Sequence, residues 1–231
     1  KTLLGHQMGE LDDDQAIAAL DLLTRDWRGD ETEFRAARQL AKLYAGKGDY
    51  RRGFELMRAA MLSDPDSPAT QRLQEEMSGV FEDLFLDKAA GQLSAVDALS
   101  LYYDFRDLTP IGRKGDEMIR TLADRLVALD LLDQAIELLS YQVDHRLEGA
   151  ARSQVAARLA VIQMMAGRPA DALKVLTGTR LAQLPAEIEN ERTMLEAHAL
   201  GETGRTELAL DLLSALPEDT QVLKARAEIL W

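Results

Sequence analysis

The chain has 231 residues, of which 46% are hydrophobic, 5% aromatic and 29% charged, and its formal net charge is −13. Its many Ala, Leu, Glu, Gln and Arg residues favour helices, and its negative charge argues against general affinity for nucleic acid or anionic membranes. The absence of cysteine excludes disulfides and Cys-based zinc or redox sites.

The sequence opens with "KTLLGHQMGE", without an initiator Met or a signal-peptide pattern, and stops at "ARAEILW" within an apparent helix. We therefore expect both ends to be truncated from a longer protein, and the compartment, cytoplasmic or periplasmic, stays open. No run of about 18 apolar residues occurs, so no membrane-spanning helix is predicted. The excess of Arg over Lys and the single Asn, Asn190, are typical of a GC-rich bacterial genome.

Helical patterns begin early in the chain. The stretch "LDDDQAIAALDLL" predicts a first amphipathic helix. Apolar residues at helical spacing from Phe34 to Tyr44 predict another, which ends at a Gly-Lys-Gly turn. A further apolar stripe begins at Tyr50 and ends at Asp64–Pro65, because proline disfavours helix in the residue before it. The last two helices form a hairpin of 34 residues, 34–67.

This hairpin resembles a tetratricopeptide (TPR) repeat. Eight residues meet the family's pattern of small and large side chains: Leu40, Ala41, Tyr44, Gly48, Tyr50, Gly53, Ala60 and Pro65. One position departs from the pattern, and one of the eight matching residues is an unusual choice. Ala37 stands where the family usually has Trp or another bulky residue, and Gly53 stands where Ala is usual. The glycine permits a close approach of the paired helices at some cost in helix propensity.

Weaker versions of the hairpin follow at 116–149, 153–184 and 190–217, and 220–231 predicts the first helix of another. Their turns, at Asp130, Gly167 and Gly204, are 37 residues apart, so these copies are TPR-like with longer helices or loops. One short hairpin cannot bury its apolar face alone, so such repeats stack and share a core.

The predicted fold is therefore all-α: a right-handed α–α superhelix, or solenoid, of stacked TPR-like hairpins. The alternative is an ordinary helical bundle with chance periodicity. Pro110 and Gly112 mark the expected division into an N-terminal part, 1–111, and a C-terminal part, 112–231. The first part includes an irregular, aromatic-rich pair of helices at 68–111, with a helical run expected to about Ala90.

The aromatic residues of this pair allow two interpretations. Five of the ten Phe and Tyr residues fall between Phe81 and Phe105. They either fill the core of an enlarged hairpin, or Tyr102, Tyr103 or Phe105 faces a groove as an interface anchor.

No catalytic constellation is recognisable in the sequence. His6, His145 and His198 are each isolated, and no zinc-binding helix motif, phosphate loop or nucleophile elbow occurs. The run Asp12–Asp14 precedes an apparent helix, where acidic residues favour the helix N-terminus, although calcium binding is an alternative. We expect no enzyme activity, no cofactor and no metal site.

Basic residues concentrate in the TPR-like hairpin. Between Phe34 and Arg58 the sequence has seven basic residues and only two acidic ones, Asp49 and Glu55. The resemblance to the TPR family implies that the first helix of each hairpin lines a concave groove for an extended peptide. The candidates on that face are Arg35, Arg38, Lys42, Arg120, Arg158, Met165 and His198. The alternative is that these side chains are solvated and pair with nearby acids.

The sequence thus predicts a non-catalytic scaffold that binds a peptide or helix of a partner protein. A more specific form of this hypothesis is that the partner is acidic, because arginine clusters bind carboxylates. The alternative is a module for self-association within a larger or envelope-associated assembly, because an uncapped repeat array exposes apolar surface. Neither nucleic acid binding nor direct membrane insertion is expected.

Overall fold

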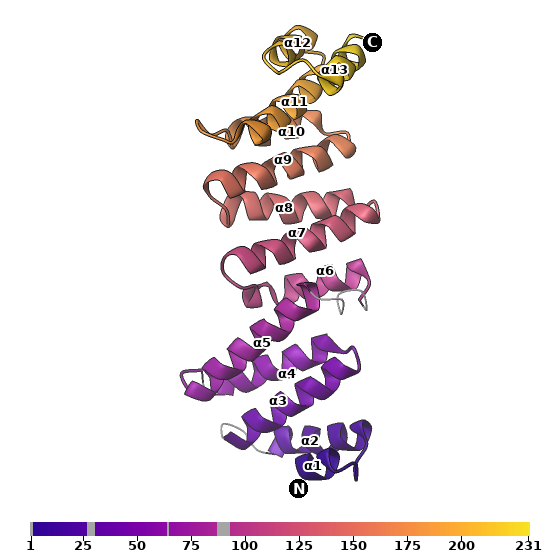
Figure 1. The fold of residues 1–231 in the computed structure, drawn as a ribbon. Coiled ribbons are helices and arrows are strands. Elements are labelled where there is room, and N and C mark those ends of the chain that lie inside the picture. Colours follow the sequence, from indigo (N-terminus) through magenta and orange to yellow (C-terminus); the bar gives the residue numbers. More distant parts are fainter. Residues whose placement is uncertain (1, 27–30, 64, 87–92) are drawn as a thin grey trace. The chain divides into compact units, whose positions relative to one another are not determined.

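The computed structural model describes residues 2–26, 31–63, 65–86 and 93–231. This described part of the chain contains thirteen α-helices, one 3-10 helix and no strand. It divides into two compact units, Lys1–Met118 and Ile119–Trp231, which are treated separately below. Figure 1 shows the order of the helices within each unit.

The first unit contains short and long helices in hairpin order: α1 (Thr2–Gln7), α2 (Asp13–Asp26), α3 (Glu31–Gly46), α4 (Tyr50–Ser63), α5 (Pro68–Leu86), α6 (Ala95–Asp104), the 3-10 helix η2 (Arg106–Leu108) and the start of α7 (Arg113–Ala128). α3 packs against α2, α4 and α5, and α4 packs against α5. Of the long helical run expected after residue 69, residues 87–92 lie outside the described residues, as does Asp64 at the end of the TPR-like hairpin.

The second unit continues from α7 with α8 (Leu132–His145), α9 (Gly149–Met165), α10 (Pro169–Gly178), α11 (Ala186–Glu202), α12 (Thr206–Ser214) and α13 (Thr220–Leu230). Each of α8 to α12 packs on the next helix in sequence. In addition, α9 contacts α11 and α11 contacts α13, so alternate helices also stack. The expected all-α fold of stacked TPR-like hairpins is confirmed by this sequential packing.

The turn between paired helices depends on one left-handed residue. Gly48, Gly167 and Gly204 have φ of 79°, 68° and 77°, and Asp130 has φ of 60° at the equivalent place. Backbone amides after these residues bond back to the preceding helix, as Asp49 N–H does to Tyr44 O at 2.9 Å. Each turn thereby satisfies carbonyls that the helix C-terminus leaves free.

Small residues set the crossing of α3 and α4. A Cβ atom on Gly53 would lie 3.2 Å from the backbone oxygen of Ala41, so the two helices are in near-contact there. Leu40 and Phe54, both buried, flank the crossing. The close approach predicted from Gly53 is therefore present.

Aromatic rings join α4, α5 and the end of α6 in one cluster. The ring of Phe54 lies 5.6 Å from that of Phe81 and 5.2 Å from that of Phe105, and Phe85 contacts Tyr102 at 6.3 Å. Tyr102 and Phe105 are 2% and 1% exposed. These two rings lie in the core, which is the first of the two alternatives left open by the sequence, and they offer no surface to a partner.

Candidate interaction site

A shallow groove lies in the first unit where α3, α4 and α5 meet, and we call it the α3–α5 groove. Its cavity has a volume of about 50 Å³. The α3 side contributes Arg38, Ala41, Lys42 and Ala45, α4 contributes Tyr50, Gly53, Phe54 and Met57, and α5 contributes Glu76 and Val80. The α3 residues recur at intervals of three and four, which places them on one face of the helix. The floor is apolar and the rim is charged.

The two cations of this rim differ in their surroundings. Arg38 forms an ion pair with Glu76 across the groove, and both side chains are partly exposed. Lys42 is exposed and has no hydrogen-bond or ion-pair partner among the described residues. A ligand carboxylate could therefore bind Lys42 without competing against an internal acid.

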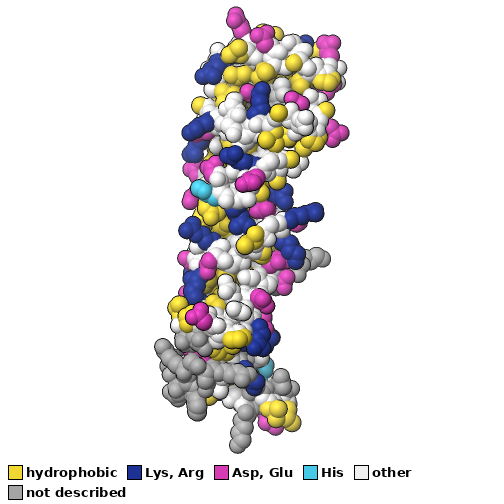
Figure 2. Space-filling view, turned by 90° about the vertical axis from the view of Figure 1, so that its left-hand side faces the viewer, with side chains coloured by type: hydrophobic (Ala, Val, Ile, Leu, Met, Phe, Trp, Pro, Cys, Tyr) yellow, Lys and Arg dark blue, Asp and Glu magenta, His cyan; other side chains and the backbone are white. Residues whose placement is uncertain are grey.

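The other basic residues of the cluster are mostly engaged within the unit. Arg51 binds Asp104 and donates to Ser100 Oγ at 3.0 Å. Arg58 donates to Asp107 at 3.0 Å and lies 4.4 Å above the ring of Phe105. Acids of α6 and η2 thus offset two of the seven positive charges. Figure 2 shows basic and acidic side chains interspersed on one face.

Lys47 extends this pairing to the preceding helix. It binds Asp14 in the first turn of α2, and this hydrogen bond raises the pKa of Lys47. Arg52 instead lies 5.3 Å above the ring of Tyr44. Arg35, a predicted groove residue, is exposed on α3 but does not line the α3–α5 groove.

In the second unit the predicted groove residues occupy α7, α9 and α11. Arg158 donates to Asp124 at 2.8 Å, so it is paired between α9 and α7. Arg120 and Met165 are exposed, whereas His198 is half-buried. Their role in binding stays a prediction.

Tyr103 is the exposed member of the predicted aromatic anchors. It is 37% exposed, and its ring packs 5.8 Å from that of Tyr102. Of the three aromatic candidates, it alone presents part of its ring to solvent.

Asp12, directly before α2, caps this helix. Asp12 Oδ1 accepts a bond from Gln15 N–H at 2.8 Å, and Gln15 Oε1 accepts one from Asp12 N–H at 3.2 Å. This reciprocal arrangement is a capping box. Among the described residues no group of three or more His, Cys, Asp or Glu is placed to hold a metal ion. In the same part of the chain no helix combines the length and hydropathy needed to cross a bilayer.

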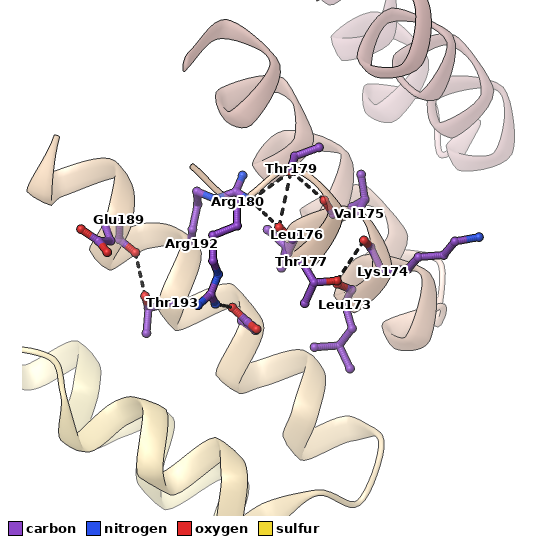
Figure 3. Close-up of polar contacts among 11 residues, drawn as sticks. Leu173, Lys174, Val175, Leu176, Thr177, Thr179, Arg180, Glu189, Arg192 and Thr193 are labelled. Carbon is purple, nitrogen blue, oxygen red and sulfur yellow. Dashed lines mark hydrogen bonds and ion pairs between the residues drawn. The ribbon is translucent and has the colours of Figure 1, made fainter. Parts of the chain in front are cut away.

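Arg192, which sequence reasoning missed, is the polar centre of the second unit (Figure 3). It is 6% exposed and donates from α11 to Ser153 O on α9, and to Leu176 O and Thr179 Oγ1 at the end of α10. Burial, and then the charge of Arg180, lower the pKa of Arg192.

A signal for this buried arginine does exist in the sequence. The 37-residue spacing of the turns places Val155 and Met118 at the equivalent positions of the two preceding hairpins. Both are buried. A charged residue at a position that is otherwise apolar indicates an internal hydrogen-bonding role.

No protein-family model matches the sequence, and no curated protein is significantly similar to it. Among solved structures, the TPR-like repeats of a Podosopora anserina kinesin light chain are 19% identical, with coverage of 86% of this chain and 98% of that chain and a TM-score of 0.42.

Two other solved structures are similar to the chain. The Naa15/Naa10 complex bound to HypK-THB has 16% identity over all of this chain and 33% of that chain, with a TM-score of 0.45. The P58(IPK) TPR domain has 12% identity over 99% of this chain and 62% of that chain, with a TM-score of 0.39. The fold itself, established above from the order and packing of the helices, is a TPR-like helical repeat.

Proposed function

We propose that the protein is a non-catalytic scaffold that binds an acidic peptide or helix of a partner protein in the α3–α5 groove. The observation that carries the proposal is Lys42, an exposed cation at the rim of an apolar groove with no internal partner among the described residues. Arg38 stands one turn earlier on the same face and adds a second positive charge. On the α4 side Tyr50 is half-buried and adds an aromatic contact at the groove.

The pairing of Arg38 with Glu76 sets the expected specificity. Glu76 offsets the charge of Arg38, so a carboxylate that binds Arg38 must displace or share it. A carboxylate that binds Lys42 displaces no internal acid, so we expect Lys42 to contribute more to affinity than Arg38. Both contacts are exposed to solvent, so binding should weaken as ionic strength rises.

The test is affinity capture from a bacterial lysate with this chain as bait and mass spectrometry as the readout. Lys42→Glu is the decisive variant because it removes no internal ion pair. Arg113→Glu is the matched control, since Arg113 is exposed on α7 and lies outside the groove lining. A protein retained by the parent and the control but lost by Lys42→Glu supports the proposal. Equal recovery by all three baits contradicts it.

Self-association is a second candidate function, favoured by the last described helix. Val222 and Ala225 of α13 are buried against α11 and α12, whereas Leu223 and Leu230 are 52% and 66% exposed. An apolar face of this kind can pack against another copy. Sedimentation at several protein concentrations distinguishes this assembly from a monomeric receptor.

A further inference from the structure

A second groove, in the other unit, runs between α10 and α12 with α11 as its floor, and we call it the α10–α12 groove. Its cavity measures about 640 Å³. Apolar side chains of all three helices line it: Ala170, Leu173, Leu200, Leu208, Leu212 and Ala215. On the α12 side the lining extends from Arg205 to Ala215, about 15 Å of helix. Leu208 is 54% exposed, so this apolar surface is open to solvent.

The lining of the α10–α12 groove carries two cations, Lys174 and Arg205, and two acids, Glu196 and Asp211. Glu196 on the floor is already paired with Arg180. Lys174 and Asp211 occupy equivalent positions, 37 residues apart, on the two rims. Arg205, at the start of α12, lines the groove, and its side chain has no hydrogen-bond or ion-pair partner among the described residues.

The preceding hairpin shows what the arginine at this position does when an acid faces it. Arg168, 37 residues before Arg205, also directly follows the left-handed glycine of its turn, and it donates to Asp133 at 2.7 Å. The residue 37 positions after Asp133 is Ala170, which lines the groove but has no carboxylate. At the later position the cation of this inter-hairpin pair is present as Arg205, and the acid is absent.

The first unit contains an ion pair of the same kind. Lys47, in the turn between α3 and α4, binds Asp14 near the start of α2. Asp14 and Asp133 each precede by two residues a fully buried alanine, Ala16 and Ala135. Pairing of the turn cation with an acid of the preceding hairpin thus recurs in the fold, which makes the unpaired Arg205 distinctive.

We propose that the α10–α12 groove docks an amphipathic helical segment of a partner protein, whose Asp or Glu supplies the carboxylate that Ala170 lacks. The apolar stripe of such a helix fits a groove of this length and lining. The carboxylate binds Arg205 as a charge-assisted, bidentate pair and fixes the register of the helix. This site is separate from the α3–α5 groove and does not depend on it.

The test uses a phage-displayed library of random 16-residue peptides, selected against the 231-residue protein. Affinities of the selected peptides are then measured by fluorescence polarisation for the parent and for the variants Arg205→Ala and Ala170→Asp. Ala170→Asp is the sharper variant, because it restores the internal acid without removing any cation or leucine of the groove. Ala151→Asp, an exposed change on α9, is the control for net charge.

We expect the selected peptides to combine Leu, Ile or Phe at helical spacing with an Asp or Glu. Arg205→Ala and Ala170→Asp should each weaken binding about tenfold or more, whereas Ala151→Asp and Lys42→Glu should change it less than twofold. The thermal midpoint of Arg205→Ala should equal that of the parent, since its guanidinium is unpaired in the folded protein.

Three results would overturn the proposal. The first is a set of selected peptides without a carboxylate, and the second is an affinity that Ala170→Asp leaves within twofold. Peptides whose affinity falls only with Lys42→Glu bind the α3–α5 groove. They contradict the proposal in the same way as the second result. The third is a dimer of the protein that Ala170→Asp dissociates in sedimentation velocity, because the occupant is then a second copy of this chain.

Discussion

Asp130 shows how a single residue adapts to a repeated turn. It adopts φ of 60° where the equivalent turns have glycine at 68° and 77°. A side chain in the left-handed region costs free energy that glycine avoids, although Asp tolerates it better than most residues. The turn is therefore kept by the surrounding helices despite an unfavourable local residue.

Asp130→Gly should raise the free energy of unfolding by about 0.5–1 kcal/mol, because glycine relieves the left-handed strain. The reverse change at an equivalent turn, Gly167→Asp, should lower it by a similar amount. Urea unfolding followed by circular dichroism measures both. A destabilised Asp130→Gly variant would show that the carboxylate contributes to the fold.

Arg192 and Arg168 provide a matched pair of buried and exposed arginines in one unit. Arg192→Met should lower the free energy of unfolding by about 2–4 kcal/mol, since it leaves carbonyl acceptors at the end of α10 unpaired and loses charge-assisted hydrogen bonds. Arg168→Met removes an exposed ion pair with Asp133 and should cost less than about 1 kcal/mol.

Arg192→Lys refines this prediction. It keeps the charge but cannot reproduce the planar fork that reaches both α9 and α10, so its unfolding midpoint should lie between those of the parent and Arg192→Met. Equal losses for Arg192→Met and Arg168→Met in thermal unfolding would mean that the buried contacts do not stabilise the unit.

At the scale of elements, glycines on a helix allow a neighbouring helix to approach closely. Gly201 on α11 faces α13, and a Cβ atom there would lie 2.9 Å from Cγ1 of Ile229. Gly79 on α5 has nothing within 4 Å of the same position. Close packing thus explains why a glycine occupies position 201, whereas no neighbouring atom requires a glycine at position 79.

Gly79→Ala should therefore stabilise the protein by about 0.5–1 kcal/mol through helix propensity alone. Gly201→Ala gains the same propensity but must displace Ile229, and we expect a net loss of about 1–2 kcal/mol. The double variant Gly201→Ala/Ile229→Ala should be more stable than the sum of the single effects predicts. Chemical denaturation of the four proteins measures this coupling, and simple additivity would contradict it.

At the scale of the whole molecule, each unit has its own sequentially packed helices and buried residues. The sequence places the division at 111/112, at the loop before α7, and this boundary stays a prediction. A division at 111/112 lies between η2 and α7, so it interrupts no helix.

We predict that residues 112–231 fold alone, because a helical repeat is stabilised by contacts between nearest neighbours. The fragment should unfold cooperatively on heating and should show a dispersed amide NMR spectrum. A fragment without a cooperative transition would contradict this boundary, and a longer fragment from residue 93 would then show whether α6 and η2 are required.

How much the sequence could predict differs between fold and site. The helical period, the left-handed turn residues and the small residues at the α3–α4 crossing are all local signals, and the structure confirms the hairpins that they predict. Arg38 and Lys42 both line the α3–α5 groove, and their role in binding stays a prediction. The pairing of Arg38 with Glu76, 38 residues away, has no local signal and only the structure reveals it.

The sequence by itself determined that this chain builds stacked helical hairpins, because hydrophobic period and turn geometry act within a few residues. Tertiary structure decided which charged side chains have an ion-pair partner and which have none among the described residues. Whether an arginine meets a carboxylate depends on the residue that the neighbouring hairpin places opposite it, as Asp133 does for Arg168 and Ala170 does not for Arg205. That contact between hairpins, rather than the local pattern, defines the candidate binding surfaces.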